Sequence, residues 1–152
     1  MKKTLALLSG IVLTLSQPSY GSQCARSNEK MALDSRALQS QLMVAALSCN
    51  QQDLYNEYIL KFRSLLERQG QDMTSYFKRV YSSNANAEMN RFITNLANAS
   101  SRQSLRVDDS VFCLTSASMF ETILSNDPQS LLLLAGQWPI EGLHGIGVCY
   151  NK

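Results

Sequence analysis

The chain has 152 residues, of which 45% are hydrophobic and 17% are charged, and this composition suits one globular domain with a single core. Its 14 Lys and Arg residues and 12 Asp and Glu residues give a formal net charge of +2. Two of the lysines lie at positions 2 and 3, in a segment that we expect to be removed, so the remaining domain is formally neutral. That balance argues against nucleic-acid binding, whose affinity comes largely from many Lys and Arg side chains that neutralise phosphates.

The first 21 residues have the three-part form of a secretory signal peptide. The two lysines are followed by an apolar run from Leu5 to Leu15 and then by Ser19-Tyr20-Gly21, a small-x-small cleavage site. We expect cleavage after Gly21, which makes residues 1–21 the signal peptide and residues 22–152 a single helical domain, periplasmic or secreted. We expect no membrane span, because a span needs about 20 apolar residues and no run in the chain is that long.

The stretch from residue 22 to residue 127 has the pattern of a helical bundle, since Gly70 is its only Gly or Pro and strand-like alternation is missing. Asp34 can cap a first helix that runs to about Ser48. A second helix is predicted to follow Asn50 as its N-cap and to stop at Gly70, where a left-handed C-terminal residue belongs. In each helix, apolar residues spaced three or four positions apart form one face. In the first helix they are Leu38, Leu42 and Ala45 or Ala46, and in the second they are Tyr55, Tyr58, Ile59, Phe62, Leu65 and Leu66.

Two shorter helices are predicted next. The first runs from Asp72 to about Tyr81, and a polar break at residues 83–86 separates it from the second, which ends near Ser101. Their inward faces are expected to consist of Met73, Tyr76, Phe77 and Val80 in the first and of Met89, Phe92, Ile93 and Leu96 in the second.

Asp residues mark the starts of the last two helices. Asp108 or Asp109 opens one of them, with Phe112, Ser116, Met119, Phe120, Ile123 and Leu124 inward. Asp127-Pro128 supplies a cap and a proline at the first position of a short helix that stops at Gly136. We therefore predict an all-α fold, a compact bundle of about five or six helices that disulfides staple, with an irregular Gly-rich coil at the C-terminus.

Four cysteines remain after export, and an even number in an oxidising compartment predicts two disulfides. No CxxC pair is present, so neither a zinc ribbon nor a thioredoxin-type motif is expected. Four cysteines allow three connectivities, and the sequence alone does not choose among them. We favour Cys49 with Cys113 and Cys24 with Cys149, because this pairing links the end of one predicted helix to the start of another and ties the chain ends together.

No catalytic constellation stands out, and we assign no catalytic residue, metal site or cofactor. Cys149 beside His144 would make an activated sulfur nucleophile, but an exported cysteine with three potential partners is expected to be bonded. A serine triad would need a turn of the G-x-S-x-G type, and the chain has none. One His, bonded cysteines and scattered acids supply neither a zinc set nor a calcium loop.

A basic stretch across the second and third predicted helices is one candidate for binding. An acidic partner or an anionic polymer of the envelope could bind there, but Glu57 and Glu67 interleave, which favours a solvated helix face. The basic side chains are Lys61, Arg63, Arg68, Lys78 and Arg79.

The tail is the other candidate for binding. It places the only Trp, Trp138, and the only His, His144, on a coil that a disulfide can hold still, and such loops often carry function. Alternatively, Trp138 and Ile140 plug one end of the bundle. Both interpretations stay open at this point.

Three segments resemble a group of small, uncharacterised exported helical proteins of proteobacteria that contain disulfides. The segments are MVAALSCNQQDLYNEYILKF (Met43 to Phe62), RFITNLA (Arg91 to Ala97) and the pair Phe112-Cys113. The resemblance implies a fold with a bridge between Cys49 and Cys113 and implies no activity.

These features favour a non-enzymatic module that presents a rigid surface to a protein partner in the cell envelope. Few charges, abundant Ser, Asn and Gln and the missing catalytic constellation support this hypothesis. One form of it is an immunity-type inhibitor of a cell-wall hydrolase, which has a similar general build. The alternatives are an envelope-acting hydrolase that uses His144 exposed in a pocket, and a carrier of a small apolar ligand between the helices.

Overall fold

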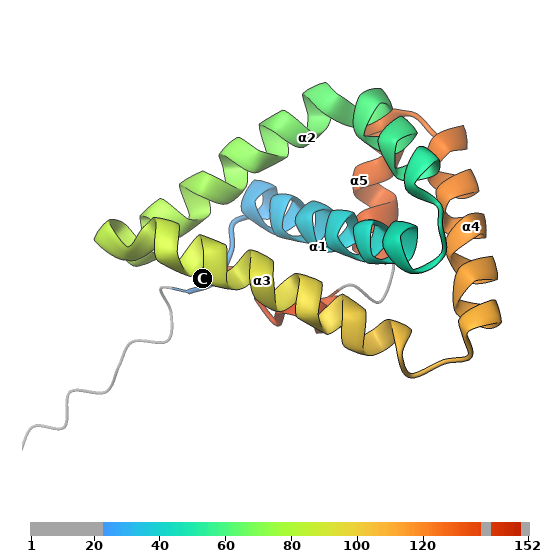
Figure 1. The fold of residues 1–152 in the computed structure, drawn as a ribbon. Helices are drawn as coiled ribbons and strands as arrows, with labels where there is room; N and C mark the ends of the chain where they lie inside the picture. Colours follow the sequence, from blue (N-terminus) through green and yellow to red (C-terminus); the bar gives the residue numbers. More distant parts are fainter. Residues whose placement is uncertain (1–22, 138–140, 150–152) are drawn as a thin grey trace, which may run out of the picture.

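The fold is organised around one helix, α1 (Ser27–Ser48), which lies inside a triangle formed by α2 (Gln52–Tyr81), α3 (Ala85–Ser104) and α4 (Asp109–Ser125) (Figure 1). The computed structural model describes residues 23–137 and 141–149. A 3-10 turn, η2 (Ser82–Asn84), joins α2 to α3, and α5 (Pro128–Gln137) and the single turn α6 (Glu141–His144) complete the described chain. Since α1 contacts all five other α-helices, it is the element that holds the bundle together.

α1 begins eight residues earlier than the sequence predicted, with its N-cap at Arg26 and not at Asp34. The backbone N–H of Arg26 donates to Glu29 Oε2 at 2.7 Å, so the helix is capped there and not at Asp34. Asp34 is an interior residue of α1, and its carboxylate contacts other side chains of the fold. The predicted end at Ser48 is confirmed.

α2 is one helix of 30 residues where the sequence predicted two, so the expected stop at Gly70 and the start at Asp72 are wrong. Gly70 lies in the helix interior, and its carbonyl accepts a hydrogen bond from Thr74 Oγ1 at 2.8 Å. The buried positions continue through Gln69 and Met73, and burial of this continuous face outweighs the weak helix propensity of one glycine. Asn50, the predicted cap, lies in the preceding turn at φ 54°, a conformation that Asn tolerates.

The described residues therefore contain four long helices and not the five or six that were predicted, with a ten-residue α5 and the one-turn α6 in addition. The polar break predicted at residues 83–86 overlaps η2, but Ala85 and Asn86 already belong to α3. Asp108 caps α4, because its Oδ1 accepts from the Ser110 N–H at 2.9 Å. Asp127 accepts from the N–H groups of Gln129 and Ser130 and so caps α5 as predicted.

Two apolar clusters form the core. The larger one joins α1, α2, α4 and α5 around Tyr58, Phe62 and Phe120. The smaller one lies near the α2–α3 junction, around Leu33, Tyr76 and Phe77. No strand occurs in the described residues beyond an isolated parallel bridge between Ala25 and Val148. Within the same residues, no helix combines the length and the apolar character that crossing a membrane requires.

Candidate functional site

The two disulfides have the pairing that the sequence analysis favoured. Cys24 bonds Cys149 and Cys49 bonds Cys113, with Cα–Cα distances of 4.9 and 5.4 Å. None of the four cysteines is free, so Cys149 offers no thiolate to act as a nucleophile beside His144.

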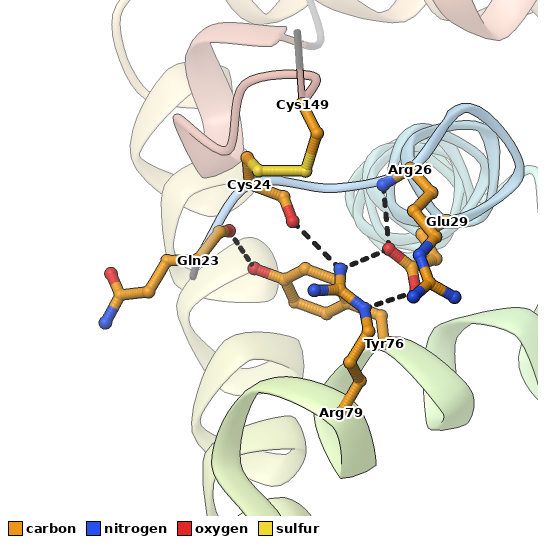
Figure 2. Close-up of a disulfide and its surroundings, with 7 residues drawn as sticks. All are labelled: Gln23, Cys24, Arg26, Glu29, Tyr76, Arg79 and Cys149. Carbon is orange, nitrogen blue, oxygen red and sulfur yellow. Dashed lines mark hydrogen bonds and ion pairs between the residues drawn. A yellow bond between two sulfur atoms is a disulfide. The ribbon is translucent and has the colours of Figure 1, made fainter. Parts of the chain in front are cut away.

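The two ends of the described chain meet at the Cys24–Cys149 disulfide, in an arrangement that we call the terminal clasp (residues 23–26 and 143–149) (Figure 2). The Ala25 N–H donates to the Gly147 carbonyl at 2.9 Å, and the Cys149 N–H donates to the Ala25 carbonyl at 2.8 Å. One covalent bond and two backbone hydrogen bonds therefore close the chain into a loop.

Side chains of α2 hold the N-terminal segment of the clasp, residues 23–26, in place. Figure 2 shows Tyr76 and Arg79 pointing toward it from α2. The Tyr76 hydroxyl donates to the Gln23 carbonyl at 2.7 Å, and Arg79 Nη2 donates to the Cys24 carbonyl at 2.9 Å. Arg79 also pairs with Glu29 of α1, through Nε at 2.9 Å and through Nη2.

The Arg79–Glu29 pair is internal, with side chains only 26% and 4% exposed. Burial alone raises the pKa of Glu29, but hydrogen bonds from Arg79 and from the Arg26 amide outweigh it, so this pKa lies below its ordinary value. Hydrogen bonding to Glu29 likewise raises the pKa of Arg79. Arg79 was a candidate for partner binding, and the structure assigns its guanidinium to the fold.

His144 is the second predicted site residue that lies inside the molecule. Its side chain is 0% exposed, and its ring lies 6.0 Å from the ring of Phe92. Nδ1 accepts from the Ile146 N–H at 3.1 Å, so the proton of the neutral ring sits on Nε2, which donates to Asp34 Oδ1 at 2.8 Å. The hydrolase alternative requires His144 exposed in a pocket, and the structure buries it.

Lys30, one helical turn before Asp34, completes this cluster. Its Nζ contacts both carboxylate oxygens of Asp34, at 2.6 and 2.7 Å. Burial alone raises the pKa of Asp34, but the hydrogen bonds from His144 and Lys30 outweigh it and hold this pKa below its ordinary value. The cluster fastens the tail to α1.

The remaining predicted binding residues do not form one surface. Lys61 donates to the Leu124 carbonyl, and Arg63 pairs with Glu67 at 3.1 Å on the exposed side of α2. Lys78 is exposed one residue before the internal Arg79, about 25 Å along α2 from Lys61. Trp138 and Ile140 lie outside the described residues.

An uncharged surface on α4 is the feature that sequence reasoning missed. No charged residue occurs between Ser110 and Phe120, and α4 lies at the outer edge of the molecule (Figure 1). Val111 and Leu114 are exposed there, as is Val107 just before the helix. We call the α4 surface the set Val107, Val111, Leu114, Thr115, Ser118, Met119 and Thr122.

Two hollows on the α4 surface adjoin each other, because Thr115 and Met119 line both of them. One, of about 180 Å³, has its apolar lining from Val107, Val111, Phe112 and Met119. Its polar lining residues are Thr115, Ser116, Gln41 of α1 and Gln103 of α3. The other, of about 450 Å³, is more open and lies beside Leu114. The Thr115 and Thr122 hydroxyls donate to carbonyls of their own helix at 2.8 and 2.9 Å. Their polar hydrogens are thus used internally, which makes the surface more apolar than its composition indicates.

The fold holds α4 firmly at both ends. The Cys49–Cys113 disulfide joins its first turns to the end of α1, and Gln51 Nε2 donates to the Cys113 carbonyl at 3.2 Å. At the other end, Lys61 of α2 donates to the Leu124 carbonyl. The charge-free run from Ser110 to Phe120 was the sequence signal for this surface, although only the inward positions of the run were predicted.

Comparisons with protein-family models, with curated proteins and with solved structures returned no match. In residues 23–137 and 141–149, no three His, Cys, Asp or Glu side chains gather closely enough to hold a metal ion. The function is therefore argued from the geometry alone.

Proposed function

We propose that the protein is a non-enzymatic binding module of the periplasm or the cell exterior, and that it docks a protein partner on the α4 surface. The observation that carries the proposal is the pairing of exposed apolar side chains with two adjoining hollows on a helix fixed at both ends. Two disulfides support an oxidising compartment.

Docking on the α4 surface would be favoured by removing its apolar side chains from water. Leu114 is 73% exposed and Val111 is 55% exposed, so both side chains keep apolar area in water that a partner would remove. The centres of protein interfaces are poor in charge, and the α4 surface shares this property. A rigid helix also loses little conformational freedom on association, which favours affinity.

The hollows indicate the chemistry of the partner. A space of about 180 Å³ with a mainly apolar lining suits one anchoring side chain, aliphatic or aromatic, and such buried anchors carry most of the energy of many interfaces. We therefore propose a partner that presents an apolar protrusion with few charges around it. This favours the general binding function over the narrower immunity hypothesis, which calls for an acidic surface facing a basic toxin.

The test is affinity purification of the oxidised protein from its native envelope after cross-linking, comparing wild type with Leu114→Asp. Leu133→Asp on α5 is the matched control, since Leu133 is 69% exposed and is not part of the α4 surface. Quantitative mass spectrometry should find a stoichiometric partner with wild type and the control, and at least about tenfold less of it with Leu114→Asp.

Three results would overturn the proposal. They are a wild-type protein that emerges alone, a partner that Leu114→Asp retains in full, and a partner that Leu133→Asp loses equally. Sedimentation of the purified protein shows whether a second copy of this chain occupies the α4 surface. A dimer formed through that surface would also count against a foreign partner.

A further inference from the structure

A groove between α1 and α2 carries features that docking on α4 does not use. Its volume is about 430 Å³, within the range of small-molecule sites, and it shares no lining residue with the α4 surface. Its apolar lining consists of Ala32 from α1 and Ile59, Leu60, Leu66 and Met73 from α2.

Arg36 of α1 lies in this groove with part of its guanidinium unused. Nη1 donates to Gln39 Oε1 at 2.7 Å, whereas Nε is buried and has no hydrogen-bond partner. No carboxylate in the described part of the chain pairs with Arg36, although the internal Arg79 and Lys30 each have one. The Nε–Nη2 edge that is left is a pair of parallel donors, which matches the two oxygens of a carboxylate.

A second polar group in the groove also lacks a partner. Gln69 is only 9% exposed, and its Oε1 is buried without a hydrogen bond in the protein. Six buried side-chain polar atoms in the described residues lack a hydrogen-bond partner, and two of them, Arg36 Nε and Gln69 Oε1, belong to residues that line this one groove. A ligand that supplies an acceptor to Arg36 and a donor to Gln69 would satisfy both atoms.

A third feature of the groove is Gly70, which lies in the interior of α2 and lines the groove. A Cβ atom built on it would meet nothing within 4 Å, so packing within the protein does not require a glycine there. Glycine in a helix interior costs about 1 kcal/mol relative to alanine. The missing side chain leaves the groove open.

We propose that the groove binds a small amphipathic carboxylate, with the anionic head on the Nε–Nη2 edge of Arg36 and the apolar body along Ile59, Leu60 and Leu66. Two kinds of molecule share this chemistry, a medium-chain fatty acid and a short apolar peptide with a free C-terminus. The inference concerns α1 and α2 and does not depend on whether α4 docks a protein.

Isothermal titration of the oxidised protein tests the proposal with two probes, decanoate and acetyl-Leu-Leu. Saturable binding of either one at a single site is the expected result, and the stronger of the two identifies the source. Decanol, which has the same chain and no charge, should bind at least about tenfold more weakly than decanoate. Absence of saturable binding with both carboxylates, or equal binding of decanol, would overturn the proposal.

Two variants assign the binding to the groove. Arg36→Gln should weaken it about tenfold or more, because the charged donor edge is lost. Arg91→Gln is the matched control, since the exposed Arg91 pairs with Glu88 on α3, outside the groove, and its affinity should stay within about twofold of wild type. Equal affinities of wild type and Arg36→Gln would contradict the assignment.

Gly70→Met provides a test that stands even if Arg36→Gln fails to fold. Methionine is a good helix former, and the open space above Gly70 admits its side chain, so the helix should persist while the groove fills. The expected result is a loss of carboxylate binding of about tenfold or more, with a thermal stability equal to or above that of wild type. Unchanged binding in a folded Gly70→Met protein would overturn the proposal.

Discussion

Two buried charged sites on α1, a few residues apart, differ in whether the protein supplies partners for the charge. At Lys30 and Asp34 the ammonium and the carboxylate contact each other, and the buried His144 adds a hydrogen bond. At Arg36 the guanidinium lies half-buried in a groove with its Nε unpaired. The difference separates two roles, because charges that the fold satisfies stabilise the fold, and a charge that the fold leaves unsatisfied is available to a ligand.

This comparison makes a general prediction about variants. Changes in the terminal clasp should reduce stability strongly and leave carboxylate binding in the groove nearly unchanged. Changes in the groove should alter binding strongly and stability little.

The largest effect is expected from removing the disulfide of the clasp. Cys24 and Cys149 are 125 residues apart, so the double change to Ser should lower the free energy of unfolding by about 5 kcal/mol on the chain-entropy model. The Cys49 and Cys113 double change closes 64 residues and should cost about 0.6 kcal/mol less. Urea unfolding at neutral pH measures both, and a much smaller cost for the clasp would show that other contacts already hold the ends.

Asp34→Ala should come next, with a loss of about 3–5 kcal/mol, because it removes the carboxylate that both Lys30 and His144 contact. Glu67→Ala breaks an ion pair whose side chains are 75% and 62% exposed, and should cost no more than about 1 kcal/mol. Similar losses in the two variants would remove the distinction between internal and surface charge on which the comparison rests.

Lowering the pH should weaken the contacts that hold the terminal clasp more than the contacts in the rest of the molecule. The pKa values of Asp34 and Glu29 are lowered in the fold, so their stabilisation is complete above the unfolded values near pH 4 and is lost as pH falls through the lowered native values. Chemical denaturation between pH 7 and pH 2 should show this decline. The Glu29→Gln and Asp34→Asn variants should have flatter curves, and a wild-type curve without a decline in this range would contradict the assignment.

The smallest expected effect is an increase in stability. Gly70→Ala should raise the free energy of unfolding by about 0.5–1 kcal/mol, because alanine favours the helix and its methyl group meets open space. Gly145→Ala is the contrasting control, since Gly145 has φ +65° and alanine is strained there. Thermal melting distinguishes the two, and a loss of stability in Gly70→Ala would indicate a packing role for that glycine.

Local chemistry made parts of the fold predictable. The caps at Asp108 and Asp127 lie next to the amides that they accept from, so a few residues of sequence determine them. The helix end predicted at Gly70 and the helix start predicted at Asp34 were wrong, because contacts with other parts of the fold determine the environments of these two residues. The helix continues through Gly70 because the residues around it pack against α1, and Asp34 contacts a histidine 110 residues away, so neither environment can be read from nearby residues.

The candidate sites divide in the same way. The exposed side of α4 follows from the periodicity of one helix, so the charge-free run could have predicted it. The groove could not be predicted, because Arg36 and Gln69 come together only when α1 packs against α2. The burial of His144 and Arg79 likewise depends on where the chain ends meet.

The nested order of the disulfides bears on how the protein matures. If the protein is exported N-terminus first, as the proposed function requires, Cys24 and Cys49 emerge long before their partners. An oxidase that joins cysteines in order of appearance would then make the wrong bond. The correct bond to Cys24 can form only after Cys149, which lies 125 residues further along the chain, has also been translocated. Maturation should therefore depend on thiol–disulfide exchange that corrects early pairings, and a cell without a disulfide isomerase should accumulate less of the native form.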